Sequence, residues 1–214
     1  MFTAEATGMR RNDEDMKIIG ITGGVGAGKS TVLGMLSELC CCEIIMADDV
    51  AKALMIKGGE LTDTAISLFG NDAYLEDGSL NRAYIAGLIY SDEELGKKWD
   101  EAVHPAVNRK ILTEINKCIE DGDKNFVFVE AALLIENHYD EICDEIWYIY
   151  ASEDTRKKRL KAQRNYSDEK CDGIIRRQMS DEQFRTHCSF VINTECSTAE
   201  TRRILQNKLE EYRN

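Results

Sequence analysis

The sequence is poor in histidine and in long hydrophobic runs, and these shortages exclude several kinds of protein or site. No stretch approaches the ~20 consecutive apolar residues that a membrane-spanning helix needs, so we expect no membrane segment. Residues 1–15 are polar and lack the apolar centre of a secretory signal, and we expect them to form a disordered tail or to reflect a start upstream of Met16. The histidines His104, His138 and His187 are too far apart in the sequence to suggest a metal cluster.

Basic residues are also scarce. The chain of 214 residues has 27 lysines and arginines against 39 aspartates and glutamates, which gives a net charge of −12. A general nucleic-acid-binding protein would carry a basic surface, and we therefore expect no nucleic-acid partner. Positive charge is nevertheless concentrated between Thr155 and Gln178. A solvated helix face explains part of this cluster, and contact with phosphate groups would explain the rest.

The cysteines do not follow the pattern of a disulfide framework or of a zinc site. Eight are present, and Cys40, Cys41 and Cys42 are consecutive, unlike the C-x-x-C spacing of metal ligands. We therefore expect reduced thiols in a cytoplasmic protein. No function for the run of three follows from the sequence.

Short apolar runs alternate with helix-compatible segments along most of the chain. Strands are expected at residues 17–21, 43–46, 126–130, 145–150 and 190–193. The runs FVFVE and EIWYIY are almost continuously apolar, which is typical of strands buried on both faces of a parallel sheet. This alternation predicts an α/β fold with a five-stranded parallel sheet flanked by helices.

No strand is predicted between residues 60 and 119. Helices are expected at 61–69 and 80–90, and a capping box at 91–94 predicts a third helix that ends near Val103. Pro105 is expected in the first turn of a separate helix that reaches Ile119. We therefore predict a helical insert at about 60–119 within a single domain that covers residues 16–214.

The segment ITGGVGAGKST at residues 21–31 follows the first predicted strand and precedes a helix-compatible stretch. It fits the spacing G-x-x-x-x-G-K-[ST] of a phosphate-binding loop, with the fixed positions at Gly23, Gly28, Lys29 and Ser30. Glycines let backbone N–H groups converge on phosphate oxygens, and the helix N-terminus behind them adds positive charge. Lys29 is expected to reach the β- and γ-phosphates of a nucleotide, and the Ser30 hydroxyl to bind Mg²⁺.

Carboxylates follow two of the predicted strands. Asp48 lies after the second strand, and ligands of open α/β sheets bind at the carboxyl ends of strands. It could take a proton from an attacking hydroxyl, although Asp48 or Asp49 could also simply cap the next helix. We favour a catalytic Asp48 with Asp49 as the cap. Glu130 could hold a Mg²⁺-bound water, or it could be an ordinary strand-end carboxylate in solvent.

Several motifs in a fixed order resemble the dephospho-CoA kinase family. They are IIGITGGVGAGKST at 18–31, IIMADDVAKAL at 44–54, HPAV at 104–107, EAALLIE at 130–136, RLKAQR at 159–164, IIRRQM at 174–179 and FVINT at 190–194. The phosphate loop alone is generic, but the ordered combination is specific, and the similarity extends from Lys17 to the C-terminus.

The resemblance implies a P-loop kinase fold with a helical coenzyme-A-binding insert and a mobile lid at about 155–180. It implies transfer of the ATP γ-phosphate to the 3′-hydroxyl of 3′-dephospho-CoA with Mg²⁺, which is the final step of coenzyme A synthesis. It implies no obligate protein partner. The residues expected to bind the ATP phosphates are Gly24, Gly26, Ala27, Gly28, Lys29, Ser30 and Thr31.

The resemblance also implies roles for individual side chains. Asp48 matches the aspartate proposed to take the proton of the 3′-hydroxyl, and Arg159 and Arg164 match the lid arginines that close on the nucleotide. The chain departs from the family's usual residues at Met46, where an aspartate is common, and at Ala132, where a proline is common. The spacing between Arg159 and Arg164 is one residue longer than in some members.

The motifs are also compatible with two other functions. The chain could be another small-molecule kinase, such as a nucleoside monophosphate kinase, or a nucleotide-dependent sensor, which would need neither Asp48 nor the basic lid. A GTPase is disfavoured because Asn116-Lys117-Cys118-Ile119 lacks the aspartate of the guanine motif. The pair His104-Pro105 is interpreted mainly as a helix start, and a substrate contact by His104 is the alternative.

Overall fold

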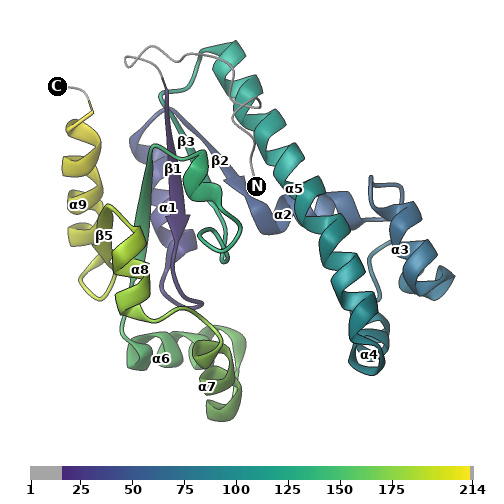
Figure 1. Ribbon diagram of the computed structural model, residues 1–214. Helices are drawn as coiled ribbons and strands as arrows, with labels where there is room; N and C mark the ends of the chain where they lie inside the picture. Colours follow the sequence, from purple (N-terminus) through teal and green to yellow (C-terminus); the bar gives the residue numbers. More distant parts are fainter. Residues whose placement is uncertain (1–15, 213–214) are drawn as a thin grey trace. The chain divides into compact units, whose positions relative to one another are not determined.

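The computed structural model describes residues 16–212, so the tail predicted at 1–15 lies outside the described residues. The chain divides into two compact units (Figure 1). One unit combines the residues up to 44 with those from 118 onward, and the other consists of residues 45–117.

A five-stranded parallel sheet confirms the predicted α/β fold. Its strands are β1 (Lys17–Thr22), β2 (Cys42–Met46), β3 (Phe126–Glu130), β4 (Glu145–Tyr150) and β5 (Phe190–Asn193), in the order β2-β3-β1-β4-β5. Every residue of β3 is buried, which explains its uninterrupted apolar sequence. Because β1 lies between β3 and β4, the loop that follows β1 leaves from the middle of the sheet, where the strand order reverses and ligands of such sheets bind.

Helices α1 (Lys29–Leu39) and α9 (Thr198–Glu210) pack together on one face of the sheet. Their side chains share a core with every second residue of the central strands, including Ile19, Ile21, Phe126, Phe128, Trp147 and Ile149. Tyr148 of β4 faces the opposite way, where it stacks on Phe184 of α8 (Asp181–His187) with the ring centroids 4.7 Å apart. The sheet is therefore covered on both faces, as the sequence predicts.

Helices α6 (Glu153–Arg164) and α7 (Asp168–Arg176) lie side by side beyond the carboxyl ends of the strands (Figure 1). Both begin at a serine whose hydroxyl accepts a hydrogen bond from the backbone N–H three residues later, which fixes the start of each helix. The short helix η3 (Tyr139–Glu141) belongs to the same unit. Helices α6 and α7 bring the basic residues of the segment 155–180 to the edge of the sheet that carries the phosphate loop.

The unit of residues 45–117 is helical. It contains α2 (Ala47–Met55), α3 (Thr62–Phe69), the short helix η2 (Asn71–Ala73), α4 (Arg82–Ser91) and most of α5 (Glu93–Asp121). Phe69 of α3 packs edge-to-face on Trp99 of α5, with the ring centroids 5.5 Å apart. Among the described residues, no helix combines the length and the apolar character needed to cross a membrane.

The predicted break near Val103 is wrong, because α5 is one helix with Pro105 in its interior. A proline there removes one backbone hydrogen bond, but the apolar residues on both sides of it are buried, and their packing keeps the helix continuous. The predicted capping box is also wrong. Ser91 ends α4 and its hydroxyl donates to the Leu88 carbonyl at 2.8 Å, whereas Asp92 Oδ1 accepts from the Glu94 N–H at 3.0 Å.

Candidate active site

The phosphate loop, residues 23–30, connects β1 to α1. Gly28 is the residue before α1 and has φ of 101°, a left-handed conformation that favours glycine. No side chain caps the N-terminus of α1, and its first turn contains no acidic residue. Backbone N–H groups at this helix end therefore stay available to an anion, and the loop fits a phosphate group.

Lys29 is the first residue of α1, and its side chain is only 14% exposed. Its Nζ donates a hydrogen bond to the Gly23 carbonyl oxygen at 2.8 Å and lies 3.5 Å from Oε1 of Glu130. Glu130 ends β3 and is itself buried. The interpretation of Glu130 as an ordinary carboxylate in solvent is therefore wrong, since it neutralises the charge of the loop lysine.

Burial is the largest influence on the pKa of Lys29 and lowers it below its ordinary value. The negative charge of Glu130 raises this pKa, while the positive charges of Arg156 and Arg164 lower it further. Two arginines, Arg156 and Arg164, and one carboxylate, Glu130, thus act on the buried ammonium of Lys29. An anionic phosphate bound there would favour protonated Lys29.

Arg156 is a buried member of the candidate site that the sequence does not distinguish from the rest of the basic cluster. It is only 7% exposed, and its guanidinium fills the space that a Cβ on Gly24 would need. Its Nε donates to the Val25 carbonyl oxygen at 2.9 Å, and its Nη2 donates to Oε1 of Gln178. The glycine at position 24 is thus explained by the close approach of this arginine.

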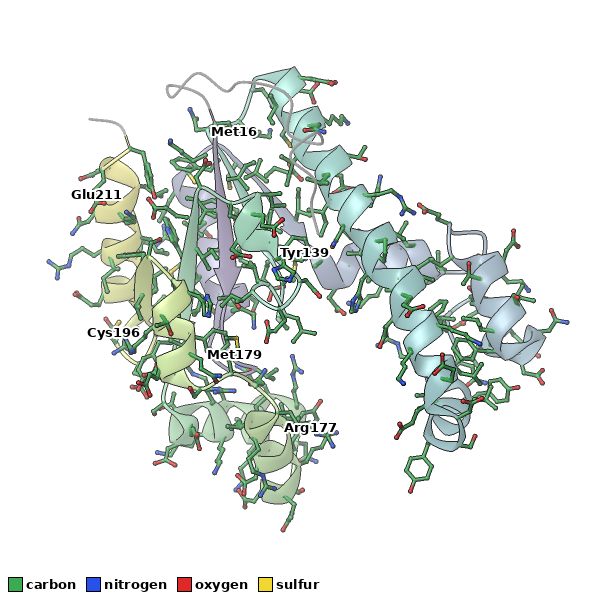
Figure 2. All side chains as sticks on the ribbon, in the orientation of Figure 1. Met16, Tyr139, Arg177, Met179, Cys196 and Glu211 are labelled. Atoms are coloured by element: carbon green, nitrogen blue, oxygen red, sulfur yellow. The ribbon has the colours of Figure 1, made fainter. Side chains whose placement is uncertain are left out.

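Gln178 joins the same group of contacts from the segment after α7. Its Oε1 also accepts the backbone N–H of Val25 at 3.2 Å. The neighbours Arg177 and Met179 are labelled in Figure 2. One side-chain oxygen thereby connects the 155–180 segment to a backbone amide of the phosphate loop, a link between distant parts of the chain that sequence spacing does not reveal.

Arg159 is bound to the phosphate loop through backbone carbonyls. Its Nη1 donates to the carbonyl oxygens of Gly26 at 3.3 Å and Ala27 at 3.0 Å. The same guanidinium bonds the hydroxyl and the carbonyl oxygen of Thr194 at 2.9 and 2.6 Å. Arg164 is the last residue of α6 and is exposed. The two predicted lid arginines therefore differ: Arg159 supports the loop, and Arg164 is open to solvent.

Asp48 and Asp49 lie in the first turn of α2, in the unit of residues 45–117. The residue before this helix is Met46, and no side chain caps it, so the interpretation of either aspartate as the cap is wrong. Both carboxylates are exposed and pair with Lys52 Nζ, at 2.6 Å from Asp48 and 2.8 Å from Asp49. These contacts raise the pKa of Lys52.

His104 and Pro105 lie inside α5, so their explanation as a helix start is wrong. His104 is exposed, which keeps its side chain accessible.

Ser30 and Thr31 are exposed in the first turn of α1. Within residues 16–212, no three His, Cys, Asp or Glu side chains form a group that could hold a metal ion.

The sequence profile of the family described as dephospho-CoA kinase matches residues 17–200. A dephospho-CoA kinase of Listeria innocua is 32% identical over 198 residues, which cover 92% of this chain and 98% of the relative.

Solved structures show the same likeness. A crystal structure from Thermus thermophilus has a TM-score of 0.76 at 28% identity and covers 92% of this chain and 98% of its own. The dephospho-CoA kinase of Campylobacter jejuni shares the fold, with a TM-score of 0.67 at 21% identity over 91% of this chain and 96% of its own. The chain therefore belongs to the dephospho-CoA kinase family, whose members are ATP-dependent kinases.

Proposed function

We propose that this chain transfers the γ-phosphoryl group of ATP to the 3′-hydroxyl of 3′-dephospho-CoA and releases ADP and coenzyme A. The observation that carries the proposal is Lys29, buried between the Gly23 carbonyl and Glu130 in a chain of this family. A lysine held in this way presents its charge to phosphate oxygens without the flexibility of a surface side chain. We propose the cytoplasm as the location, in keeping with eight cysteines that form no disulfide in the described chain.

The phosphate loop would bind the ATP phosphates through the amides at the N-terminus of α1. Lys29 would attract the β- and γ-oxygens, where negative charge changes most during transfer. Its bond to the Gly23 carbonyl and its pair with Glu130 hold the ammonium in place before the nucleotide arrives. The site then needs little rearrangement when ATP binds.

The Ser30 hydroxyl, exposed in the first turn of α1, would hold the Mg²⁺ that accompanies ATP. Magnesium bound to a nucleotide takes most of its ligands from phosphates and water, so a single hydroxyl suits it. When bound, the ion neutralises charge on the β- and γ-oxygens. Glu130 already pairs with Lys29, and we therefore assign it to positioning that lysine rather than to the metal.

Asp48 would accept the proton of the 3′-hydroxyl. In this step the hydroxyl oxygen bonds to the γ-phosphorus, the bond from that phosphorus to the ADP oxygen breaks, and the proton passes to the Asp48 carboxylate. The carboxylate is exposed and paired with Lys52, so it is accessible to an acceptor molecule. Its freedom from a capping role favours this function over a structural one.

The segment 155–180 would act as the lid. Its Gln178 contacts the Val25 amide through a hydrogen bond at 3.2 Å, and a phosphate oxygen competing for that amide would displace the glutamine. Arg164 has an exposed guanidinium that could then approach the nucleotide. Arg159, with bonds to Gly26, Ala27 and Thr194, would keep the loop in shape while the rest of the segment moves.

An ADP-release assay with defined acceptors tests the proposal. ATP is supplied with 3′-dephospho-CoA, AMP, CMP or no acceptor, and only 3′-dephospho-CoA should give rapid ADP release. Preference for AMP or CMP would indicate a nucleoside monophosphate kinase. Binding of ATP without acceptor-dependent release would indicate a sensor.

A further inference from the structure

The run Cys40-Cys41-Cys42 follows the C-terminal end of α1, opposite to Lys29, and ends on the first residue of β2. Two of its side chains converge on the same backbone atom, the carbonyl oxygen of Leu36. The Sγ of Cys40 lies 3.3 Å from this oxygen and the Sγ of Cys42 lies 3.8 Å from it. The third side chain points elsewhere, since Cys41 donates to the Asp123 carbonyl oxygen at 3.1 Å.

The local backbone explains this convergence. Cys40 follows the last residue of α1 in an extended conformation, with φ of −147° and ψ of 160°, and Cys42 is the first residue of β2. In extended chain, side chains two residues apart lie on the same side, so Cys40 and Cys42 share a face that Cys41 does not. Both packed cysteines are partly accessible to solvent, whereas Cys41 is exposed.

The two thiols also interact directly. A hydrogen bond from Cys40 is the main cause that lowers the pKa of Cys42, and the charge of Lys124 contributes in the same direction. Burial and the charge of Glu43 oppose this shift. A lowered pKa favours the thiolate of Cys42, and the thiolate is the reactive form of cysteine.

We propose that Cys40 and Cys42 form an oxidisable dithiol, a modification site that a hydroperoxide converts to an intramolecular disulfide. The Cys42 thiolate attacks one oxygen of hydrogen peroxide, the O–O bond breaks, and a sulfenic acid forms as the departing hydroxide takes a proton to become water. The Cys40 sulfur then attacks the Cys42 sulfur, the S–O bond breaks, and a second water leaves. The two thiols lose two protons and two electrons in total, and these reduce the peroxide to two waters.

Oxidation would change the end of the helix that begins at Lys29. In the reduced state, the Leu36 carbonyl oxygen accepts the Cys40 backbone N–H at 3.1 Å, and the Cys40 and Cys42 sulfurs lie 3.3 and 3.8 Å from it, where either S–H can donate to it. A disulfide has no S–H donor, so only the backbone bond would remain. The proposal concerns this dithiol alone and does not depend on the identity of the kinase substrate.

Peptide mass spectrometry of the full-length protein tests the proposal. Cleavage after Lys29 and Lys52 gives a peptide, residues 30–52, whose only cysteines are the run of three. After hydrogen peroxide and then an alkylating reagent, this peptide should carry one alkyl group on Cys41 and lack two hydrogens. Dithiothreitol before alkylation should restore three alkyl groups.

Serine variants identify the partners. Cys41→Ser is the matched control and should still form the disulfide, whereas Cys40→Ser and Cys42→Ser should lose it. Far-ultraviolet circular dichroism checks that each variant is folded. A further test uses phenylarsine oxide, which bridges paired thiols. In the reduced wild type, it should protect Cys40 and Cys42 from alkylation. Loss of the disulfide in Cys41→Ser, its persistence in Cys40→Ser, or three alkylated cysteines after peroxide would each overturn the proposal.

Discussion

The ammonium of Lys29 lies 3.5 Å from the Glu130 carboxylate, and both side chains are largely buried. This pair joins the first residue of α1 to the last residue of β3, two neighbouring positions at the carboxyl edge of the sheet. A buried charge pair is costly to break on one side, because the remaining charge has lost its partner and is still shielded from water. We therefore expect activity and stability to change together when Lys29 is replaced.

Replacement of Glu130 should change the pH dependence of the reaction. The carboxylate raises the pKa of Lys29, which burial lowers. In Glu130→Gln the lysine should lose its proton at a lower pH, so the alkaline limb of kcat/KM for ATP should move to lower pH. The exposed Glu136→Gln is the matched control. An unchanged alkaline limb in Glu130→Gln would show that Lys29 does not titrate as part of this pair.

Removal of the lysine should reduce both activity and stability. In Lys29→Ala we expect turnover to fall on the order of a hundredfold or more, because the γ-phosphoryl group no longer has the positive charge of the lysine beside it during transfer. We also expect a loss of roughly 3 kcal/mol in the free energy of unfolding, because Glu130 is left buried without its partner. The double variant Lys29→Ala/Glu130→Gln should recover most of the stability and none of the activity. Urea unfolding and steady-state kinetics measure these effects, and simple addition of the two stability losses would argue against the coupling.

Asp48 and Asp49 offer a matched comparison, because both lie in the first turn of α2 and both pair with Lys52. Asp48→Asn should lower turnover by roughly 10²–10⁴-fold with little change in ATP affinity, because the proton acceptor is lost. Asp49→Asn should leave turnover nearly unchanged. Neither change should lower stability appreciably, since exposed pairs of this spacing contribute little. Equal turnover in the two variants would remove Asp48 from the mechanism.

Gln178 should stabilise the contact between the segment 155–180 and the phosphate loop when no nucleotide is bound. In Gln178→Ala, the Val25 amide and the buried Arg156 lose their shared acceptor, which should cost about 1.5–3 kcal/mol. Amide hydrogen exchange across residues 155–180 should accelerate without nucleotide, and KM for ATP should change more than kcat. The adjacent Arg177→Ala is the control, because Arg177 is exposed. Identical exchange in the two variants would contradict the proposed lid contact.

Local patterns predicted the fold well where burial alone decides the structure. The near-continuous apolar runs of β3 and β4 correspond to strands covered on both faces, and the glycine spacing located the phosphate loop. The patterns failed where tertiary packing outweighs a local signal. A proline is usually found in the first turn of a helix. In α5, the burial of apolar residues on both sides of Pro105 outweighs the one missing hydrogen bond.

Contacts across long stretches of sequence were also beyond prediction. The bonds from Arg156 to Val25 and from Arg159 to Ala27 span 131 and 132 residues, and a basic cluster alone does not say which arginine points inward. Helix α8 was missed, although Ser180 and Gln183 form a capping box that could have revealed it. The pairing of Glu130 with Lys29 follows from the neighbouring positions of β1 and β3, which only the strand order reveals.

Direct identification of the product tests the central claim most sharply. The protein is incubated with ATP, Mg²⁺ and 3′-dephospho-CoA, and the acceptor is analysed by mass spectrometry and phosphorus NMR, with Lys29→Ala as the inactive reference. We predict coenzyme A with a new 3′-phosphate, formed in step with ADP and nearly absent with the variant. ADP release without phosphorylated acceptor, or equal product with Lys29→Ala, would contradict the assignment of this chain as the kinase that phosphorylates 3′-dephospho-CoA.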